Sequence, residues 1–292
     1  MTRVLLTGAS GYLGEHVLAV HAARGLSCVP TSRSGRVGVA CDLTDGASVR
    51  ALLGEVRPTA IVHCAAQVPK SAGAYDDADA ARDSIAMIAA LAEHASCRIV
   101  LVSSMTVYGP QTPMPAQEDI AAEPEGAYAR GKSAAEKILW NRRRAGDVAL
   151  RLPGLFGVPR RSGVLYNAAR RLLVEGSFEL NAQPGFWSAM AVQDAAEYVV
   201  RAAVDESNPP PQAVNVGYEG EFRLTDAIAR VAALCNIAWQ TPSVVFPAFA
   251  ADLRRLNARY GMVSATLTQR LAELVAEVRR DIEGAAGGNR AV

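Results

Sequence analysis

The sequence lacks most features of secreted, membrane-bound and nucleic-acid-binding proteins. Its five cysteines are widely spaced without a C-x-x-C pair, so neither a disulfide framework nor a zinc site is indicated, and we expect no metal. No apolar run approaches the roughly 18 residues that span a membrane, and the first residues do not resemble a signal peptide. The net charge of +1 attracts neither nucleic acid nor an anionic membrane. These absences predict a cytoplasmic protein that acts on a small molecule.

Short apolar runs alternate with longer helical patterns up to residue 151, which is typical of βαβ units in a parallel sheet. Strands are predicted at 4–7, 27–31, 37–40, 60–63, 98–102, 148–151 and 213–216. Helices are predicted at 14–24, 48–56, 79–95, 128–144, 192–205, 224–235 and 267–281, with one more among the loops of 153–185. We therefore expect an α/β fold, a doubly wound parallel sheet with a smaller, partly C-terminal lobe.

A glycine-rich segment, Gly8-Ala-Ser-Gly11-Tyr-Leu-Gly14, lies between the first predicted strand and the first predicted helix. Glycine permits a tight turn and lets backbone N–H groups and the positive end of the helix dipole approach a pyrophosphate. A tight turn without a ligand is the alternative. The position after a strand favours a Rossmann-type phosphate loop. The expected dinucleotide contacts are Gly8, Ser10, Gly11, Tyr12, Leu13 and Gly14.

Tyr128 and Lys132 are four residues apart in a predicted helix, which places both side chains on one face. A phenol has an ordinary pKa of about 10 and is a poor base at neutral pH. A neighbouring ammonium group, together with the positive nicotinamide of an oxidised dinucleotide, would lower that pKa. The pair is a candidate for proton exchange with a substrate, and an exposed helix pair without function is the alternative.

Several further motifs resemble those of the extended short-chain dehydrogenase/reductase family, whose best-known members are nucleotide-sugar epimerases, dehydratases and 4-ketoreductases. The resemblance runs from residue 4 to about residue 157, and more loosely to the end. It rests on the two features above and on Cys41-Asp42-Leu43, His63-Cys64-Ala65-Ala66, Val102-Ser103-Ser104-Met105-Thr106-Val107-Tyr108-Gly109 and Arg151-Leu-Pro153. It implies a dinucleotide-binding core at 1–157 and mainly a substrate lobe at 158–292, with 189–217 returning to the core. It also implies a homodimer.

The resemblance implies roles for individual residues. Hydride would pass between the nicotinamide and a substrate carbon while Tyr128 exchanges the proton on the attached oxygen, and Lys132 would also hold the nicotinamide ribose. Ser104 would polarise the substrate carbonyl; the alternative is Ser103, with Ser104 capping a turn. The other cofactor contacts would be Ser32, Arg33, Asp42, Leu43, Cys64, Ala65, Ala66, Ser103 and Pro153. The other substrate contacts would be Gln67, Met105, Thr106 and Trp187.

Three positions depart from the family pattern. The helix before the fifth strand usually carries an asparagine near its start, where this chain has Ser84, or Asp83 if the alignment shifts by one. The acid and base of the dehydratases are replaced by Met105-Thr106, which argues against a 4,6-dehydratase. Trp187 stands where nucleotide-sugar enzymes commonly have an arginine that binds the diphosphate, and no second arginine is found shortly before Asp252. A sugar diphosphate could instead use Arg160, Arg161, Arg170 or Arg171.

The end of the second predicted strand indicates the cofactor. Enzymes that prefer NAD place an acidic residue there to bind the adenosine ribose, and it would repel a 2′-phosphate. This chain has no acidic residue between that strand and Asp42, whereas Arg33, with Ser32 and Arg36, could pair with the phosphate. Stacking of Arg33 on the adenine is the alternative. We expect a preference for NADP(H), with NAD(H) possible.

These residues favour an NADP(H)-dependent reductase of a keto-sugar or a nucleotide-linked keto-sugar. A sugar C4 epimerase that keeps its cofactor bound is the alternative within catalysis. A non-catalytic sensor that binds a dinucleotide is the third hypothesis. A serine hydrolase is disfavoured because the chain has no G-x-S-x-G motif.

Overall fold

The computed structural model of the chain describes residues 2–68, 72–120 and 123–288. Seven parallel strands form one sheet in the order β3-β2-β1-β4-β5-β6-β9, while β7 and β8 pair separately. The strands are β1 (Val4–Thr7), β2 (Cys28–Ser32), β3 (Val39–Ala40), β4 (Ala60–His63), β5 (Arg98–Ser104), β6 (Val148–Leu152), β7 (Gly154–Phe156), β8 (Ala189–Ala191) and β9 (Gln212–Asn215). The helices are α1 (Tyr12–Ala23), α2 (Gly46–Val56), α3 (Ala78–His94), α4 (Gly126–Asn141), α5 (Val164–Glu175), α6 (Val192–Val204), α7 (Leu224–Cys235), α8 (Arg254–Tyr260) and α9 (Leu267–Gly288), with short 3-10 helices η1 (Ala72–Asp76) and η2 (Met105–Val107).

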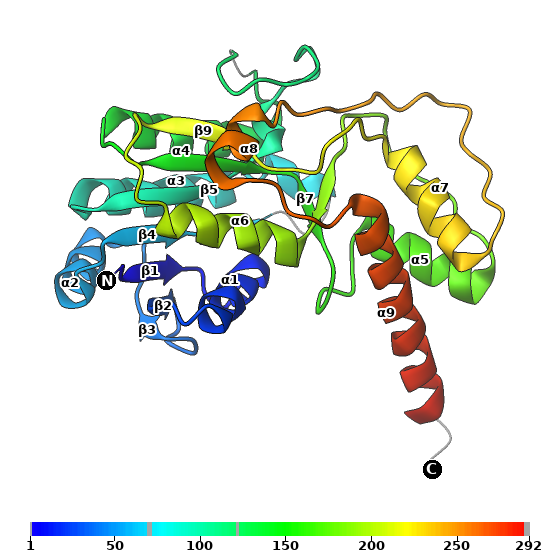
Figure 1. Cartoon of the computed structure of the whole chain (residues 1–292), viewed down its shortest axis with the longest axis horizontal. Coiled ribbons are helices and arrows are strands. Elements are labelled where there is room, and N and C mark those ends of the chain that lie inside the picture. Colours follow the sequence, from blue (N-terminus) through cyan, green and yellow to red (C-terminus); the bar gives the residue numbers. More distant parts are fainter. Residues whose placement is uncertain (1, 69–71, 121–122, 289–292) are drawn as a thin grey trace.

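Alternate residues of the strands enter two cores, because successive side chains of a strand point to opposite faces of the sheet. In β1, Val4 and Leu6 join the core that includes α1 and α6, whereas Leu5 joins the core that includes α2, α3 and α4. The helices thus cover both faces of the sheet (Figure 1). The predicted α/β fold with a doubly wound parallel sheet is confirmed.

The second half of the chain contributes to both the sheet and a separate helical group. β9 pairs with β6 at the edge of the sheet, and α6 packs against α1. In contrast, α5, α7 and α9 pack against one another and lie beside the sheet in Figure 1. The division into a core at 1–157 and a substrate lobe at 158–292 stays a prediction.

The structure departs from the sequence pattern at several element ends. The β7–β8 pair and α8 were not expected, because their segments of three to seven residues are too short to show a period. α4 begins at Gly126, two residues earlier than expected, where the Asp76 carboxylate of η1 accepts a hydrogen bond from Ala127 N (3.4 Å). α9 continues to Gly288 instead of ending at residue 281, and Ile282 packs against the larger core.

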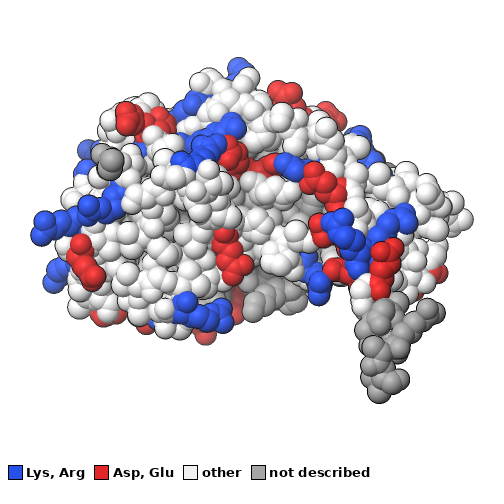
Figure 2. Space-filling model, turned by 60° about the horizontal axis from the view of Figure 1, so that its bottom comes forward, with Lys and Arg blue, Asp and Glu red and all other residues white. Residues whose placement is uncertain are grey.

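Charged side chains of both signs are intermingled on the face that Figure 2 shows. Within the described ranges, no helix is both long and apolar enough to cross a membrane. Among the same residues, no three His, Cys, Asp or Glu side chains are grouped so that they could hold a metal ion.

His63 at the end of β4 makes the stability of the fold dependent on pH. Its Nδ1 hydrogen-bonds Thr7 Oγ1 (2.8 Å), and burial, with a smaller contribution from Lys132, lowers the pKa of His63 to about 3. The unfolded chain binds a proton here below about pH 6.5, whereas the folded chain does so only near pH 3. The free energy of unfolding therefore falls as the pH drops through this window, by up to about 1.4 kcal/mol per pH unit.

We expect His63→Asn to lose less stability than the unmodified protein between about pH 6.5 and pH 4, measured by urea unfolding. His16→Asn, at a partly exposed histidine of α1, is the control and should follow the unmodified protein. Parallel pH profiles of the unmodified protein and His63→Asn would contradict the prediction.

Candidate active site

The glycine segment brings the ends of β1 and β4 into direct backbone contact. Gly8 has φ +69°, and a Cβ on it would lie 2.6 Å from Ala65 N, while a Cβ on Gly14 would overlap Gly8 O. Gly11 is the N-cap of α1 and offers no side chain to the first-turn N–H groups. This open helix N-terminus, at the point where the sheet order reverses between β1 and β4, fits the diphosphate of a dinucleotide.

The other expected cofactor residues differ in what their side chains can offer. Tyr12 donates its phenol proton to Gly157 O (2.7 Å), so only its backbone N–H, and not its side chain, is available to a phosphate at the glycine segment. Ser32 Oγ bonds both Val37 O (2.9 Å) and Val37 N (3.1 Å) and is engaged within its own loop. Arg33, by contrast, is exposed directly after β2. Leu13 lies in α1 and Leu43 is buried in a core, so neither offers its side chain. The remaining members follow strand ends or lie in neighbouring loops: Ser10, Asp42, Cys64, Ala66 and Pro153.

Lys132 and Tyr128 lie on one face of α4, as the spacing predicts. The Lys132 ammonium is 5.8 Å from the Tyr128 ring centroid and donates to Val102 O of β5 (2.8 Å). Burial lowers the pKa of Lys132 to about 8, although Cys64 and Glu136 act in the opposite direction. The amine is thus held between α4 and the end of β5.

The pKa of Tyr128 shifts opposite to the expected direction. Burial, together with the neighbouring Tyr75, raises it to about 12, and the hydrogen bond with Ser104 opposes this shift only in part. In the chain by itself burial therefore outweighs the favourable contacts, and the expected lowering of this pKa by Lys132 together with an oxidised nicotinamide stays a prediction. The phenol is held in its protonated form, which is the form that can donate a proton.

Neighbouring serines at the end of β5 have different surroundings because they point to opposite faces of the sheet. Ser103 is buried and donates to Glu136 Oε1 (2.5 Å), so its hydroxyl is used inside the protein. Ser104 is partly exposed, accepts from Thr106 N (3.2 Å) and Thr106 Oγ1 (3.0 Å), and lies close enough to Tyr128 to act on its pKa. Ser104 thus both caps η2 and meets the candidate catalytic phenol.

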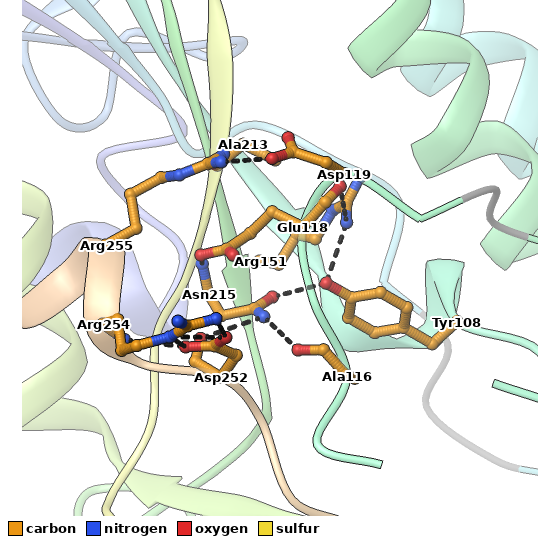
Figure 3. Close-up of polar contacts among 10 residues, drawn as sticks. All are labelled: Tyr108, Ala116, Glu118, Asp119, Arg151, Ala213, Asn215, Asp252, Arg254 and Arg255. Carbon is orange, nitrogen blue, oxygen red and sulfur yellow. Dashed lines mark hydrogen bonds and ion pairs between the residues drawn. The ribbon is translucent and has the colours of Figure 1, made fainter. Parts of the chain in front are cut away.

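A buried polar network supports this arrangement and was not anticipated. Glu136, one turn beyond Lys132, forms two hydrogen bonds with Arg151 of β6 (3.0 and 2.8 Å). Arg151 also donates to Tyr108 Oη (2.8 Å), which bonds Asn215 Oδ1 of β9 (2.8 Å) (Figure 3). Burial by itself would lower the pKa of Arg151, but Glu136 and Tyr108 raise it overall. The repeated spacing of four residues from Tyr128 to Lys132 to Glu136 was the available signal.

The expected substrate residues are divided between two surroundings. Met105 is buried in a small cluster with Phe249, and Phe186 packs against Phe249 with ring centroids 6.0 Å apart. Trp187 instead packs against the larger core. Gln67 is exposed, and its backbone N donates to Ser84 Oγ (3.1 Å). Ser84, not Asp83, therefore makes the contact with the loop after β4.

Tyr75 is a further aromatic residue at the site that the sequence did not indicate. It lies in η1, is 45% exposed, and meets the Tyr128 ring edge to face with centroids 5.6 Å apart. The segment around it shows no motif, so no sequence signal could have placed it there.

Known proteins resemble this chain in both sequence and fold. A model of the "NAD dependent epimerase/dehydratase family" matches residues 4–217. A dTDP-4-keto-6-deoxy-D-glucose reductase from Streptomyces niveus is 34% identical over 47% of each chain. A UDP-glucose 4-epimerase from Mycolicibacterium smegmatis is 31% identical over 47% of this chain and 50% of its own. The aligned part therefore spans about half the length of these curated relatives.

Solved structures resemble the fold over nearly the whole chain. The enzyme WbmH of Bordetella bronchiseptica, in complex with NAD+, has a TM-score of 0.72 at 22% identity and covers 96% of this chain and 99% of its own. A UDP-glucose 4-epimerase of Thermotoga maritima, with UDP-glucose, has a TM-score of 0.78 at 16% identity and covers 96% of this chain and 100% of its own. At these identities the likeness shows the fold alone.

The buried Glu136–Arg151 pair should contribute strongly to stability. We expect Glu136→Gln to lower the free energy of unfolding by about 3–5 kcal/mol, because it leaves the buried Arg151 without its counter-charge. Glu175→Gln, which removes the exposed pair with Arg171, is the control and should change the free energy of unfolding by about 0.5 kcal/mol or less. Urea unfolding measures both, and equal effects of the two variants would contradict the burial argument.

Proposed function

This chain belongs to the NAD-dependent epimerase/dehydratase family, and we propose that it is an oxidoreductase that uses NADP(H) to reduce a keto-sugar or a nucleotide-linked keto-sugar. The observation that supports this most is the meeting of Tyr128, Ser104 and Lys132 at the carboxyl end of β5. The glycine segment opens at the same edge of the parallel sheet. A proton donor and a dinucleotide site thus share one crevice.

Each residue of the group has a role in this proposal. The glycine segment would hold the diphosphate of a dinucleotide and Lys132 its nicotinamide ribose, and the bound dinucleotide would supply the hydride. Tyr128 holds a proton at its phenol oxygen and donates it to the carbonyl oxygen of the substrate. Ser104 orients and polarises that carbonyl, and Thr106 fixes the Ser104 hydroxyl through its own hydroxyl (3.0 Å).

Burial of Tyr128 is compatible with its role as proton donor. A phenol with a pKa of about 12 is protonated over the neutral range, so a proton is available for the carbonyl oxygen of the substrate. The 34% identical relative from Streptomyces niveus is a ketoreductase by name, and the similarity extends that role to this chain as part of the proposal.

A sugar C4 epimerase is the second candidate, favoured by the 31% identical UDP-glucose 4-epimerase. The two are separated by incubating the enzyme with NADPH and a panel of 4-keto-sugars, with and without a nucleotide, and with UDP-glucose. Continuous oxidation of NADPH supports the reductase. Conversion of UDP-glucose to its C4 epimer without net oxidation would overturn it in favour of the epimerase.

Tyr128→Phe removes the proton donor and leaves the shape of the ring. We expect the reduction rate to fall about 10²–10⁴-fold with little change in NADPH affinity. Lys132→Ala should lose both rate and NADPH affinity because its role is double. Tyr166→Phe, on α5, is the control and should keep the rate of the unmodified enzyme. Near-normal turnover by Tyr128→Phe, measured by NADPH absorbance, would contradict the assignment.

We expect kcat/KM to be at least about tenfold higher with NADPH than with NADH, because an Arg33 contact with the 2′-phosphate would be charge-assisted. Arg33→Ala should remove most of this preference, mainly by raising KM for NADPH. Arg50→Ala, at an exposed arginine of α2, is the control and should leave the preference unchanged. Equal use of both cofactors by the unmodified enzyme would contradict the proposed NADP(H) preference and favour the epimerase.

A further inference from the structure

A hydrogen bond joins the glycine segment to the loop after β7, although the two are distant in sequence. Tyr12, the first residue of α1, donates from its phenol to Gly157 O (2.7 Å). The backbone N of Arg160 donates to the same carbonyl (3.2 Å) and closes a turn. This pair of contacts fixes the backbone of Arg160 relative to the start of α1.

The Arg160 side chain lies against Tyr12 but has no strong polar partner. Its guanidinium carbon is 5.3 Å from the centroid of the Tyr12 ring. Its hydrogen bonds to Ser162 Oγ (3.3 Å) and Leu155 O (3.4 Å) are both long. Within the described part of the chain no carboxylate pairs with Arg160, whereas its neighbour Arg161 forms an ion pair with Asp281 (2.6 Å). Arg160 therefore keeps an available positive charge.

That charge adds to a second feature that attracts anions. The first turn of α1 has no side-chain cap, and its N–H groups and dipole favour negative charge at the same place. A stacked guanidinium stays charged, and Nη2 of Arg160 takes part in neither of the two long hydrogen bonds, so its N–H groups can bind a phosphate. An arginine without an ion pair in the described part of the chain thus lies against the first residue of this helix.

We propose that Arg160 is a diphosphate-binding residue, which reaches from the Tyr12 ring to the diphosphate at the glycine segment. The proposal rests on the proposed dinucleotide-dependent function. A nucleotide-sugar would present the same chemical group. We assign the contact to the dinucleotide because Tyr12, on which Arg160 lies, is itself part of the phosphate loop.

The test compares Arg160→Gln with its neighbour Arg161→Gln. Dissociation constants for NADPH, ADP-ribose, adenosine and UDP are measured by fluorescence or calorimetry, and the melting temperature of each variant verifies folding. Arg160→Gln should raise the dissociation constants of NADPH and ADP-ribose about 10- to 100-fold, as expected for the loss of charge-assisted hydrogen bonds. Its affinities for adenosine and UDP should not change, and Arg161→Gln should bind every ligand as the unmodified protein does.

A further variant tests the link through Tyr12. Tyr12→Phe keeps the ring but loses the bond to Gly157 O, so its effect on ADP-ribose binding should not be additive with that of Arg160→Gln. Equal affinities of Arg160→Gln and the unmodified protein for ADP-ribose would overturn the inference and leave the proposed function standing. If Arg160→Gln lost affinity for UDP only, the assignment of the contact to the dinucleotide would be overturned. Failure of the unmodified protein to bind NADPH and ADP-ribose would instead overturn the proposed function.

Discussion

The buried carboxylate of Glu136 is the group on which the position of the candidate active site depends. It lies one helical turn beyond Lys132 and is bound by Arg151 from β6 and by Ser103 from β5. A buried charge without these partners would be destabilising by several kcal/mol, so α4 cannot shift along the sheet without a large loss of stability. The same pairing therefore holds Lys132 and Tyr128 level with the carboxyl end of β5.

The network continues from Arg151 to the opposite side of the crevice. Through Tyr108 it reaches Asn215 at the end of β9, whose Nδ2 donates to Ala116 O (2.9 Å) and Asp252 O (3.3 Å). Figure 3 shows how these side chains join β6, β9, the loop after β5 and the segment before α8. The ends of β1 and β4 thus form one part of the carboxyl edge of the sheet, and the polar network connects β6 and β9 in another part.

The sequence matches to known proteins cover only part of the chain. The family match ends at residue 217, and the curated relatives align over only about half of their length. Phe186 and Phe249 are in ring contact beside Met105, one of the expected substrate residues, and Arg161 forms an ion pair with Asp281.

The sequence by itself determined the α/β fold, the phosphate loop and the Tyr128–Lys132 pair, because each depends on residues close together in the chain and on a regular period. It left open which of Ser103 and Ser104 meets Tyr128, since both serines contact α4, Ser103 through Glu136 and Ser104 at Tyr128. The rise of the Tyr128 pKa in the chain by itself could not be predicted, because burial is a property of the packed structure. The contact between Tyr12 and Gly157 joins segments far apart in the sequence, so only the tertiary structure decided that Arg160 lies beside the phosphate loop.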